Sequence, residues 1–561
     1  MKKILTVLFL LTLPFVSLLG KDRIRERVYI ATDKEVYVAG DAVWMSAWCV
    51  DAATGELSSF SKTAYVEIHS SAGMAFTGKV SLDKGRGAGR LILPTTLPTG
   101  TYRLFAYTRL GAAEEGFDPL TGARTLSIFN TLSAERVQGG VEVVEEVPQR
   151  PSVAAAGALQ VTATDAASSS RARILLSNPG TETVSFCLSV RHDDGIPSPE
   201  GEHIADFMHG VRTLPAAKGF DGSVVPDYEG EILRARVSGT DAAGVRAMAD
   251  KYAFISSPGA GENLYTDLIT GNGIVTFYTS NIYGNQEMFL EIEDLGEGNV
   301  CHLELISPFL DLPAGELAPL NLHPDYASAL ELRGVGMQLE KSFDADTLYS
   351  ELPARTHLLF DERDCHSYIL DDYTRFQVME EVFIEFIPEM RVRNVNGKRD
   401  IQIWTANSQG GYSFQSGRSL VLLDGVPVLD HEKMVAYDPL LVKRIDIYTH
   451  TFLFGARSFD GVVNFVTYKG TLPSLKFADN VRVVDFQGCS IPLAYTCKGL
   501  GSDYPDYRQT IYWHPMLTLA PGERVEVECK TPAYGGRFEV VAEGLTATLD
   551  PVRATAAFEV K

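Results

Sequence analysis

The stretch that decides the fold runs from Leu420 to Val428 and reads Leu-Val-Leu-Leu-Asp-Gly-Val-Pro-Val. Asp424 and Gly425 separate two apolar runs in it. An Asp-Gly pair in this position favours a β-hairpin, because a type I′ turn needs two residues that accept positive φ. We therefore expect two short strands joined by a tight turn.

Two further strands are expected downstream of this hairpin. Ile445–Tyr448 and Val462–Val466 are rich in β-branched and aromatic residues, and a turn around Gly455 lies between them. Runs of this kind, bounded by turn residues, are typical of β-strands. The segment 419–470 therefore predicts a β-rich domain.

Three consecutive motifs in this segment resemble the plug domain of TonB-dependent outer-membrane receptors. They are LVLLDGVPV, VKRIDIYT and FGARSFDGVVNFVTYKG. Upstream, MEEVFIEFIPEMRVR from Met379 resembles the opening helix and first strand of that domain, whereas the Arg-Gly pair common in receptor plugs is missing near Ile401–Trp404. The resemblance implies an α+β plug-like domain over 371–475.

A receptor plug fills a barrel that follows it in the chain, and each barrel strand needs about ten residues. The sequence between Gly470 and Lys561 is too short for a large barrel. We therefore expect the plug-like domain either to act alone as a soluble module or to dock with a barrel that belongs to another chain.

The composition is that of a multi-domain globular protein. A length of 561 residues suggests roughly three to four domains. The 72 acidic residues outnumber the 50 basic ones, which argues against nucleic acid as a partner because nucleic-acid binding needs clustered Lys and Arg. Residues 1–20 have the pattern of a secretory signal, so we expect an exported protein, in the periplasm, at the outer membrane or on the cell surface. No other long apolar run is present, and no transmembrane segment is expected.

Alternating strands between Arg27 and Asn130 predict a β-sandwich. The even spacing of Trp44 and Trp48 places both side chains on one face of a strand. The motifs IATDKEVYVAGDAVWMSAWCVDA and GRLILPTTLPTGTYRLFAYT resemble the second macroglobulin-like domain of the alpha-2-macroglobulin family, with Ala39 in place of the family's Pro. The Cys-x-Glu-Gln thioester of the protease-trapping members is missing, so the resemblance implies the fold without the trapping reaction.

The remaining segments extend a mainly β organisation of tandem Ig-like and macroglobulin-like sandwiches. A helical connector is expected because apolar residues between Tyr326 and Lys341 have helical spacing, although Gly334 and Gly336 weaken it. The expected order is a macroglobulin-like sandwich over 21–133, a linker over 134–156, an Ig-like sandwich over 157–225, an Ig-like or transthyretin-like module over 226–312, the helical connector over 313–370, the plug-like domain over 371–475 and a small C-terminal sandwich over 476–561.

No motif for catalysis or for a cofactor stands out. His431-Glu432 begins like a zinc-protease helix, but residue 435 is Val, so the motif fails. The polar cluster 361–366 is either a metal site or an acidic loop, and the acids around 294–299 are either a calcium loop or a hairpin turn. We favour the structural alternative for both and expect no metal. Among seven cysteines, Cys489 and Cys497 are close enough to form a disulfide.

Phe452, Leu453 and Phe454 are the candidate binding residues. They either pack under the sheet or form an exposed apolar contact for a partner. The first functional hypothesis is a non-enzymatic scaffold or accessory subunit whose plug-like domain docks to an outer-membrane or envelope protein, including a β-barrel complex. The alternatives are a free binding protein for a peptide or glycan, and a hydrolase with an unrecognised site.

Overall fold

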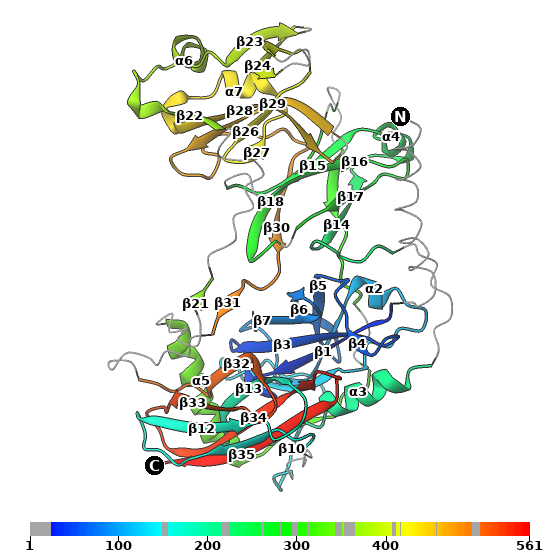
Figure 1. Cartoon of the computed structure of the whole chain (residues 1–561), viewed down its shortest axis with the longest axis vertical. Helices are drawn as coiled ribbons and strands as arrows, with labels where there is room; N and C mark the ends of the chain where they lie inside the picture. Colours follow the sequence, from blue (N-terminus) through cyan, green and yellow to red (C-terminus); the bar gives the residue numbers. More distant parts are fainter. Residues whose placement is uncertain are drawn as a thin grey trace. The chain divides into compact units, whose positions relative to one another are not determined.

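The computed structural model describes residues 24–148, 155–215, 224–259, 263–280, 282–293, 295, 301–311, 315–342, 350–352, 365–395, 397–406, 411–415, 417–455, 457–495 and 505–561. The predicted signal segment lies outside them. The chain forms two compact units, each built from separate stretches of sequence (Figure 1). Unit 1 comprises Met1–Gly230, Pro308–Pro353 and Cys489–Lys561, and unit 2 comprises Glu231–Ser307 and Ala354–Gly488. The predicted mainly β architecture is confirmed.

The first sandwich of unit 1 has two layers that share the long strand β6 (Gly73–Asp83). One layer contains β1 (Glu26–Thr32), β3 (Ala42–Asp51), β4 (Glu56–Leu57) and β7 (Arg86–Ile92). The other contains β5 (Thr63–Ser70), β8 (Gly100–Tyr107), β9 (Arg124–Phe129) and β2 (Val36–Val38). The short helix α2 (Arg109–Ala112) follows β8. Alternating side chains such as Ile30, Met45 and Leu104 fill the core between the layers.

The second sandwich of unit 1 combines strands from distant parts of the sequence. One sheet has the order β11 (Gln160–Ala163), β12 (Arg171–Ser177), β33 (Arg524–Lys530), and the other has β32 (Thr510–Leu519), β13 (Val184–His192), β34 (Gly536–Thr546), β35 (Pro551–Val560). The sequence-based expectation of two separate sandwiches, over 157–225 and 476–561, is therefore wrong. Neither half is a closed unit, because β13 lies between β32 and β34 and one shared core contains Phe186 and Phe538.

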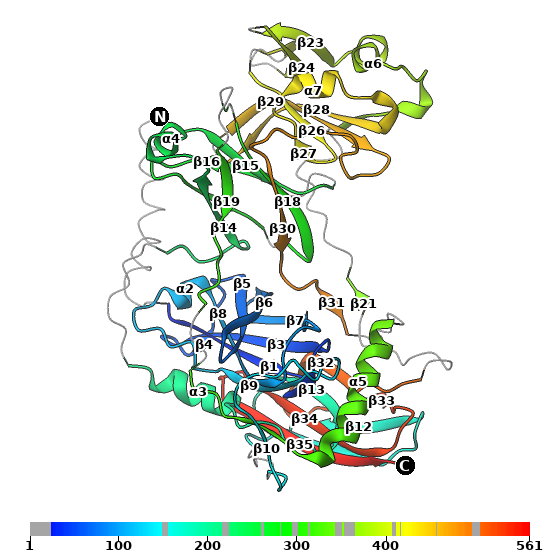
Figure 2. The ribbon, with the colours of Figure 1, turned by 180° about the vertical axis from the view of Figure 1, so that it is seen from behind.

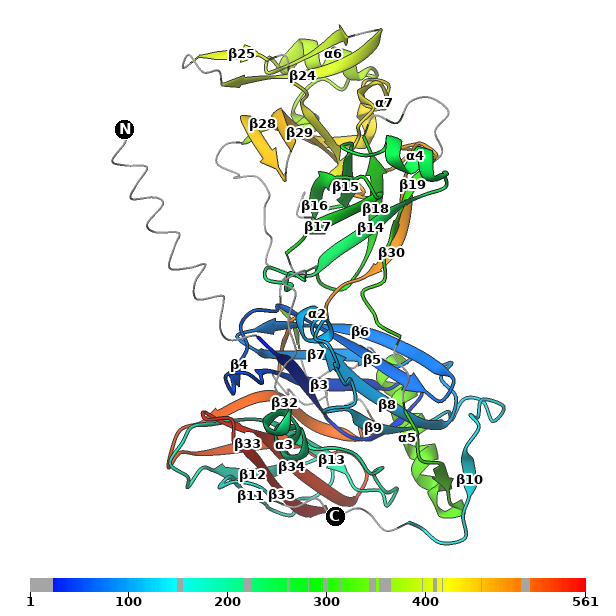
Figure 3. The same cartoon turned by 90° about the vertical axis from the view of Figure 1, so that its right-hand side faces the viewer.

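Aromatic side chains and a polar network join the two sandwiches of unit 1, which lie as stacked layers (Figure 3). Trp44 and Trp48 share one face of β3, as predicted, and pack with Trp513 and with Phe207 of helix α3 (Ile204–Thr213). These rings lie outside the core of the first sandwich. They therefore serve the contact between sandwiches rather than the interior of one of them.

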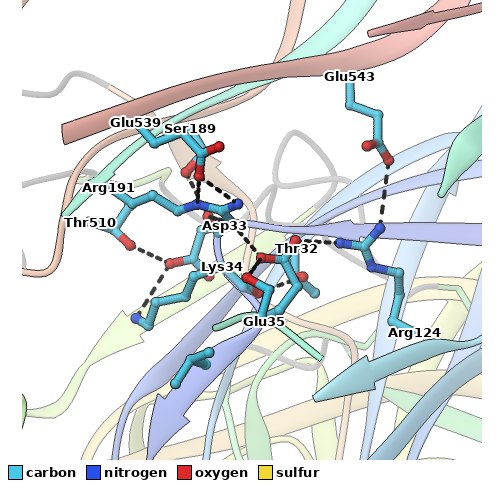
Figure 4. A network of polar contacts seen from close by, with 12 residues as sticks. Thr32, Asp33, Lys34, Glu35, Arg124, Ser189, Arg191, Thr510, Glu539 and Glu543 are labelled. Carbon is cyan, nitrogen blue, oxygen red and sulfur yellow. Dashed lines mark hydrogen bonds and ion pairs between the residues drawn. The ribbon is translucent and has the colours of Figure 1, made fainter. Parts of the chain in front are cut away.

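Glu35 is the centre of the polar network (Figure 4). Its carboxylate lies 2.8 Å from the guanidinium of Arg124 and 2.7 Å from that of Arg191. Asp33, one of its neighbours in the loop after β1, accepts hydrogen bonds from Thr510 and Arg191 of the second sandwich. Burial opposes the ionisation of Glu35, but the two arginines lower its pKa to about 2. Glu35 therefore stays ionised although it is buried, because one arginine from each sandwich neutralises its charge.

Helix α5 (Ala327–Ser342) belongs to unit 1 and runs along its side (Figure 2). Arg333 donates to Asp194 at 2.5 Å and to the carbonyl oxygen of Val36 at 2.7 Å. The predicted helix is present, but its predicted role as a connector into the plug-like domain is wrong. The helix instead packs against unit 1, where its buried face contacts residues of both sandwiches. Before it, β10 (Val141–Val143) pairs with β20 (Leu320–Leu322) in a two-stranded sheet.

Unit 2 contains a small sandwich and an α+β module. The sandwich has one sheet of β17 (Ile274–Tyr278), β14 (Ile232–Ser238) and β19 (His302–Leu305), and another of β16 (Leu264–Leu268), β15 (Tyr252–Ser256), β18 (Asn285–Ile292) and β30 (Arg482–Gln487). Helix α4 (Ala242–Ala247) follows β14. Strand β30 lies beyond the predicted limits of this module, 226–312, because the chain returns to it after the α+β module.

The α+β module has a mixed five-stranded sheet with helices. The order is β22 (Cys365–Ile369), β28 (Val442–Phe454), β29 (Arg457–Thr467), β26 (Leu420–Leu423), β27 (Val426–Pro427), and β26 is parallel to β29. A smaller sheet contains β23 (Met390–Val395), β24 (Lys398–Ala406) and β25 (Tyr412–Phe414), and the helices are α6 (Met379–Phe386) and α7 (His431–Val435). The Asp424–Gly425 turn forms as predicted, with φ of +47° and +85°.

The side chain of Asp424 binds the segment that follows β29 to the β26–β27 hairpin. Its buried carboxylate accepts hydrogen bonds from the amide and hydroxyl of Thr467, both at 2.7 Å, and from the amide of Leu472 at 2.9 Å. The turn residue therefore holds the end of β29 as well as its own hairpin.

Candidate binding sites in unit 2

The predicted binding residues lie near the tip of the β28–β29 hairpin. Strand alternation sends Phe452 and Phe454 to one face and Leu453 to the other. Phe452 and Phe454 are half-buried and pack against an apolar cluster that includes Phe254 and Phe459. Leu453 is 78% exposed. The structure thus places two of the three side chains against the neighbouring sandwich of unit 2 and leaves one as a surface residue.

The hairpin tip is held against the sandwich of unit 2. Arg457 lies 2.9 Å from the carboxylate of Glu293, and its guanidinium lies over the ring of Tyr252 at 4.7 Å from the centroid. Arg418 binds the same carboxylate at 2.5 Å. At the turn, a Cβ on Gly455 would overlap the carbonyl oxygen of Thr266. Leu453 is therefore presented on an anchored support.

A second candidate site is a cleft of about 600 Å³ in unit 2. Its walls come from β18, from β24, from α7 and from the segment 475–481. A volume of this size is ordinary for a ligand-binding pocket. Sequence reasoning missed this site, because its lysines, Lys398, Lys433 and Lys476, are scattered along the chain and no motif links them.

Two glutamates at the end of β18 have opposite environments. Glu293, which is 3% exposed, is held by the two arginines named above. Glu291 lines the cleft, and burial raises its pKa to about 7, although Lys433 and Arg418 act in the opposite direction. A carboxyl group that faces a cleft and has a raised pKa is a candidate functional group.

His431, from the failed zinc motif, and His366, from the polar cluster 361–366, each lie beside a carboxylate. His431 is buried, and its Nδ1 lies 2.6 Å from the carboxylate of Asp400. His366 lies 2.8 Å from Glu389, whose pKa is lowered by His366 and Tyr368 against the effect of burial. Each imidazole thus has a carboxylate partner, and the carboxylate of Glu389 also accepts a hydrogen bond from the hydroxyl of Tyr368 at 2.7 Å.

The metal and disulfide predictions depend largely on residues that are not among those described. Residues 361–364, 294, 296–300 and 496–504 are not among those described, so the acidic loops and the Cys489–Cys497 bridge stay predictions. Within the described ranges, there is no group of three or more His, Cys, Asp or Glu side chains that could hold a metal ion. None of the helices in those ranges is long and apolar enough to span a bilayer.

No protein-family model and no curated protein sequence matches the chain. Similar solved structures include a variant of Salmonella alpha-2-macroglobulin, at 11% identity and a TM-score of 0.23, over 96% of this chain and 40% of that one. Trypsin-activated alpha-2-macroglobulin from Escherichia coli has 8% identity and a TM-score of 0.16, over 96% and 24%. The Escherichia coli adhesin FdeC has 12% identity and a TM-score of 0.14, over 48% and 60%. The chain spans less than two thirds of each, and scores this low carry no argument about fold or function.

Proposed function

We propose that the protein is a non-enzymatic modular scaffold of the bacterial cell envelope. In this proposal the α+β module, with its plug-like sequence motifs, docks to an outer-membrane or envelope protein through the hairpin tip at Leu453. The signal-like start of the sequence supports export, and the tandem sandwiches suit a protein that positions a docking module. The macroglobulin-like motifs add support for an envelope protein without thioester chemistry.

The exposure of Leu453 carries this proposal. Its neighbours Phe452 and Phe454 are half-buried. The hairpin tip therefore loses little conformational freedom when a partner covers Leu453. An apolar side chain on an ordered support is an efficient contact, because binding then costs less ordering entropy. A single exposed leucine is common on protein surfaces, so the test must show that this position is specific.

Site-specific photo-crosslinking in cells tests the proposal. A photoreactive amino acid at position 453 should capture a defined envelope protein. In a separate affinity purification without the crosslinker, Leu453→Asp should reduce recovery of that protein by about tenfold or more relative to wild type, as for an interface anchor. Tyr468, which is 51% exposed on the same module, is the matched control position. Equal capture from positions 453 and 468, or no capture from 453, would contradict docking at the hairpin tip.

A further inference from the structure

Three lysines line the cleft of unit 2 from different elements. Lys398 begins β24, Lys433 belongs to α7 and Lys476 lies in the segment 475–481. Lys433 donates to the carbonyl oxygen of Lys476 at 2.9 Å. In the described part of the chain, none of the three ammonium groups forms an ion pair with a carboxylate. Lys398 and Lys476 are exposed, whereas the charge of Lys433 also acts on Glu291.

The acids of the cleft offset this charge only in part. Asp400 is within 2.6 Å of His431, and Asp430 accepts a hydrogen bond from the amide of Glu432. Burial raises the pKa of Glu291 to about 7, which makes this group partly neutral at neutral pH. The cleft is therefore a locally basic region on a protein whose net charge is −22.

Apolar side chains complete the lining. Half-buried Leu295 lies beyond the end of β18, and half-buried Leu475, Phe477 and Val481 lie on the side of the segment that leads to β30, whereas Ile292 is buried in the sandwich core. Phe477 is held by Phe289, with ring centroids 4.9 Å apart. A carboxylate pairs with the lysines through its charge, which a neutral sugar lacks, and a peptide also offers an apolar side chain to the surface beside them, which a free phosphate lacks.

We propose that this cleft binds an acidic peptide segment of a partner protein. Carboxylates of the segment pair with Lys398, Lys433 and Lys476, and an apolar side chain between them packs on the surface around Phe477. The main chain of the segment lies along the cleft. This site is separate from Leu453 and does not depend on docking at the hairpin tip.

Fluorescence anisotropy with the full-length mature protein tests this proposal. The probe is a labelled, acetylated octapeptide of alternating Glu and Leu, and the comparison peptide has Gln in place of each Glu. Lys398→Glu/Lys476→Glu changes two exposed cleft lysines. Lys443→Glu/Lys469→Glu is the matched control, because it changes two exposed lysines of the same module outside the cleft and lowers the net charge equally. Circular dichroism and melting curves confirm that both variants fold.

The Glu-Leu peptide should bind wild-type protein, and its affinity should fall by about tenfold or more with the cleft variant but less than about twofold with the control variant. The Gln-Leu peptide should bind at least about tenfold more weakly, and added salt should weaken the Glu-Leu complex. Equal losses in the two variants, equal binding of the two peptides, or no binding of the Glu-Leu peptide at millimolar concentration would each overturn the proposal. Retained capture at position 453 alongside any of these results would leave docking at the hairpin tip intact.

Discussion

Glu35 shows how a single residue links two domains. Its side chain lies in the loop after β1, yet its partners Arg124 and Arg191 belong to the first and the second sandwich. Disruption of a buried carboxylate–guanidinium network costs much folding free energy, because removal of one partner leaves a buried charge without compensation. Its local sequence gives no sign of this role, since Asp33-Lys34-Glu35 is typical of a solvated turn.

Replacement of Glu35 by Gln should lower the free energy of unfolding by about 3 kcal/mol at pH 7, because Arg124 and Arg191 lose their shared anion. The folded-state pKa of Glu35, about 2, lies below its ordinary value of 4.5. Its stabilisation is therefore present above pH 4.5 and is lost as the pH falls toward 2. Urea unfolding followed by tryptophan fluorescence at pH 7 and pH 3 should show a smaller difference between wild type and variant at pH 3.

Glu528→Gln is the control for this prediction. Glu528 pairs with Arg171 at 2.9 Å on the exposed face of the second sandwich. Exposed pairs contribute little, so this variant should unfold almost as wild type does. A difference between wild type and Glu35→Gln that stays constant from pH 7 to pH 3 would show that the charge of Glu35 is not the cause.

The binding residues were predictable from the sequence only in part. The run Phe452–Phe454 is apolar, and strand alternation explains why Leu453 faces away from its two neighbours. Which face would be covered depends on Phe254 and Tyr252, which are distant in the sequence. The cleft depends even more on distant residues, since its walls meet only after the chain has folded.

Helix α5 shows the same limit at the scale of an element. Its apolar spacing predicts a helix, and its glycines predict a weak one, because Gly costs about 1 kcal/mol relative to Ala in a helix interior. The structure explains both glycines, because neighbouring segments approach the helix too closely for a Cβ atom. A Cβ on Gly336 would lie 2.6 Å from the carbonyl oxygen of Tyr507, and one on Gly334 would lie 2.9 Å from the hydroxyl of Thr131.

Gly336→Ala should therefore destabilise unit 1, although Ala is the better helix former. The clash is with backbone, which cannot move aside as a flexible side chain can, and overpacking of this kind costs about 1–3 kcal/mol. Ser328→Ala, at an exposed position of the same helix, should be neutral or slightly stabilising. Thermal unfolding of both variants separates helix propensity from packing, and a raised melting temperature for Gly336→Ala would refute the close approach.

At the scale of the whole molecule, strand patterns predicted the mainly β class, because alternation and turn residues act locally, whereas the α+β module was implied only by the resemblance to receptor plugs. They did not predict that β13 would pair with β32 and β34. Each half of the second sandwich has the length and alternation of a small domain, and local patterns do not identify which strands pair across the insertion of unit 2. The boundaries over 157–225 and 476–561 failed for this reason.

Truncation after Gly535 tests this topology. It removes β34 and β35, which pair with β13 and with each other. The core around Phe186 should open, and trypsin should then cleave at Arg191, which is 9% exposed in the intact protein. Mass spectrometry of limited digests reports the cleavage, and removal of Lys561 alone is the control. If 157–225 were a domain of its own, Arg191 would stay protected after the longer truncation.

The division of the second sandwich between two distant parts of the sequence also sets the order in which its strands can pair during translation. Because β13 leaves the ribosome long before β34 does, its hydrogen-bonding edges have no native neighbour until the last strands emerge. Unit 2 has all its strands earlier and can mature first. During synthesis, β13 is therefore an aggregation-prone edge, and a chaperone that shields exposed strands should be needed until β34 and β35 are complete.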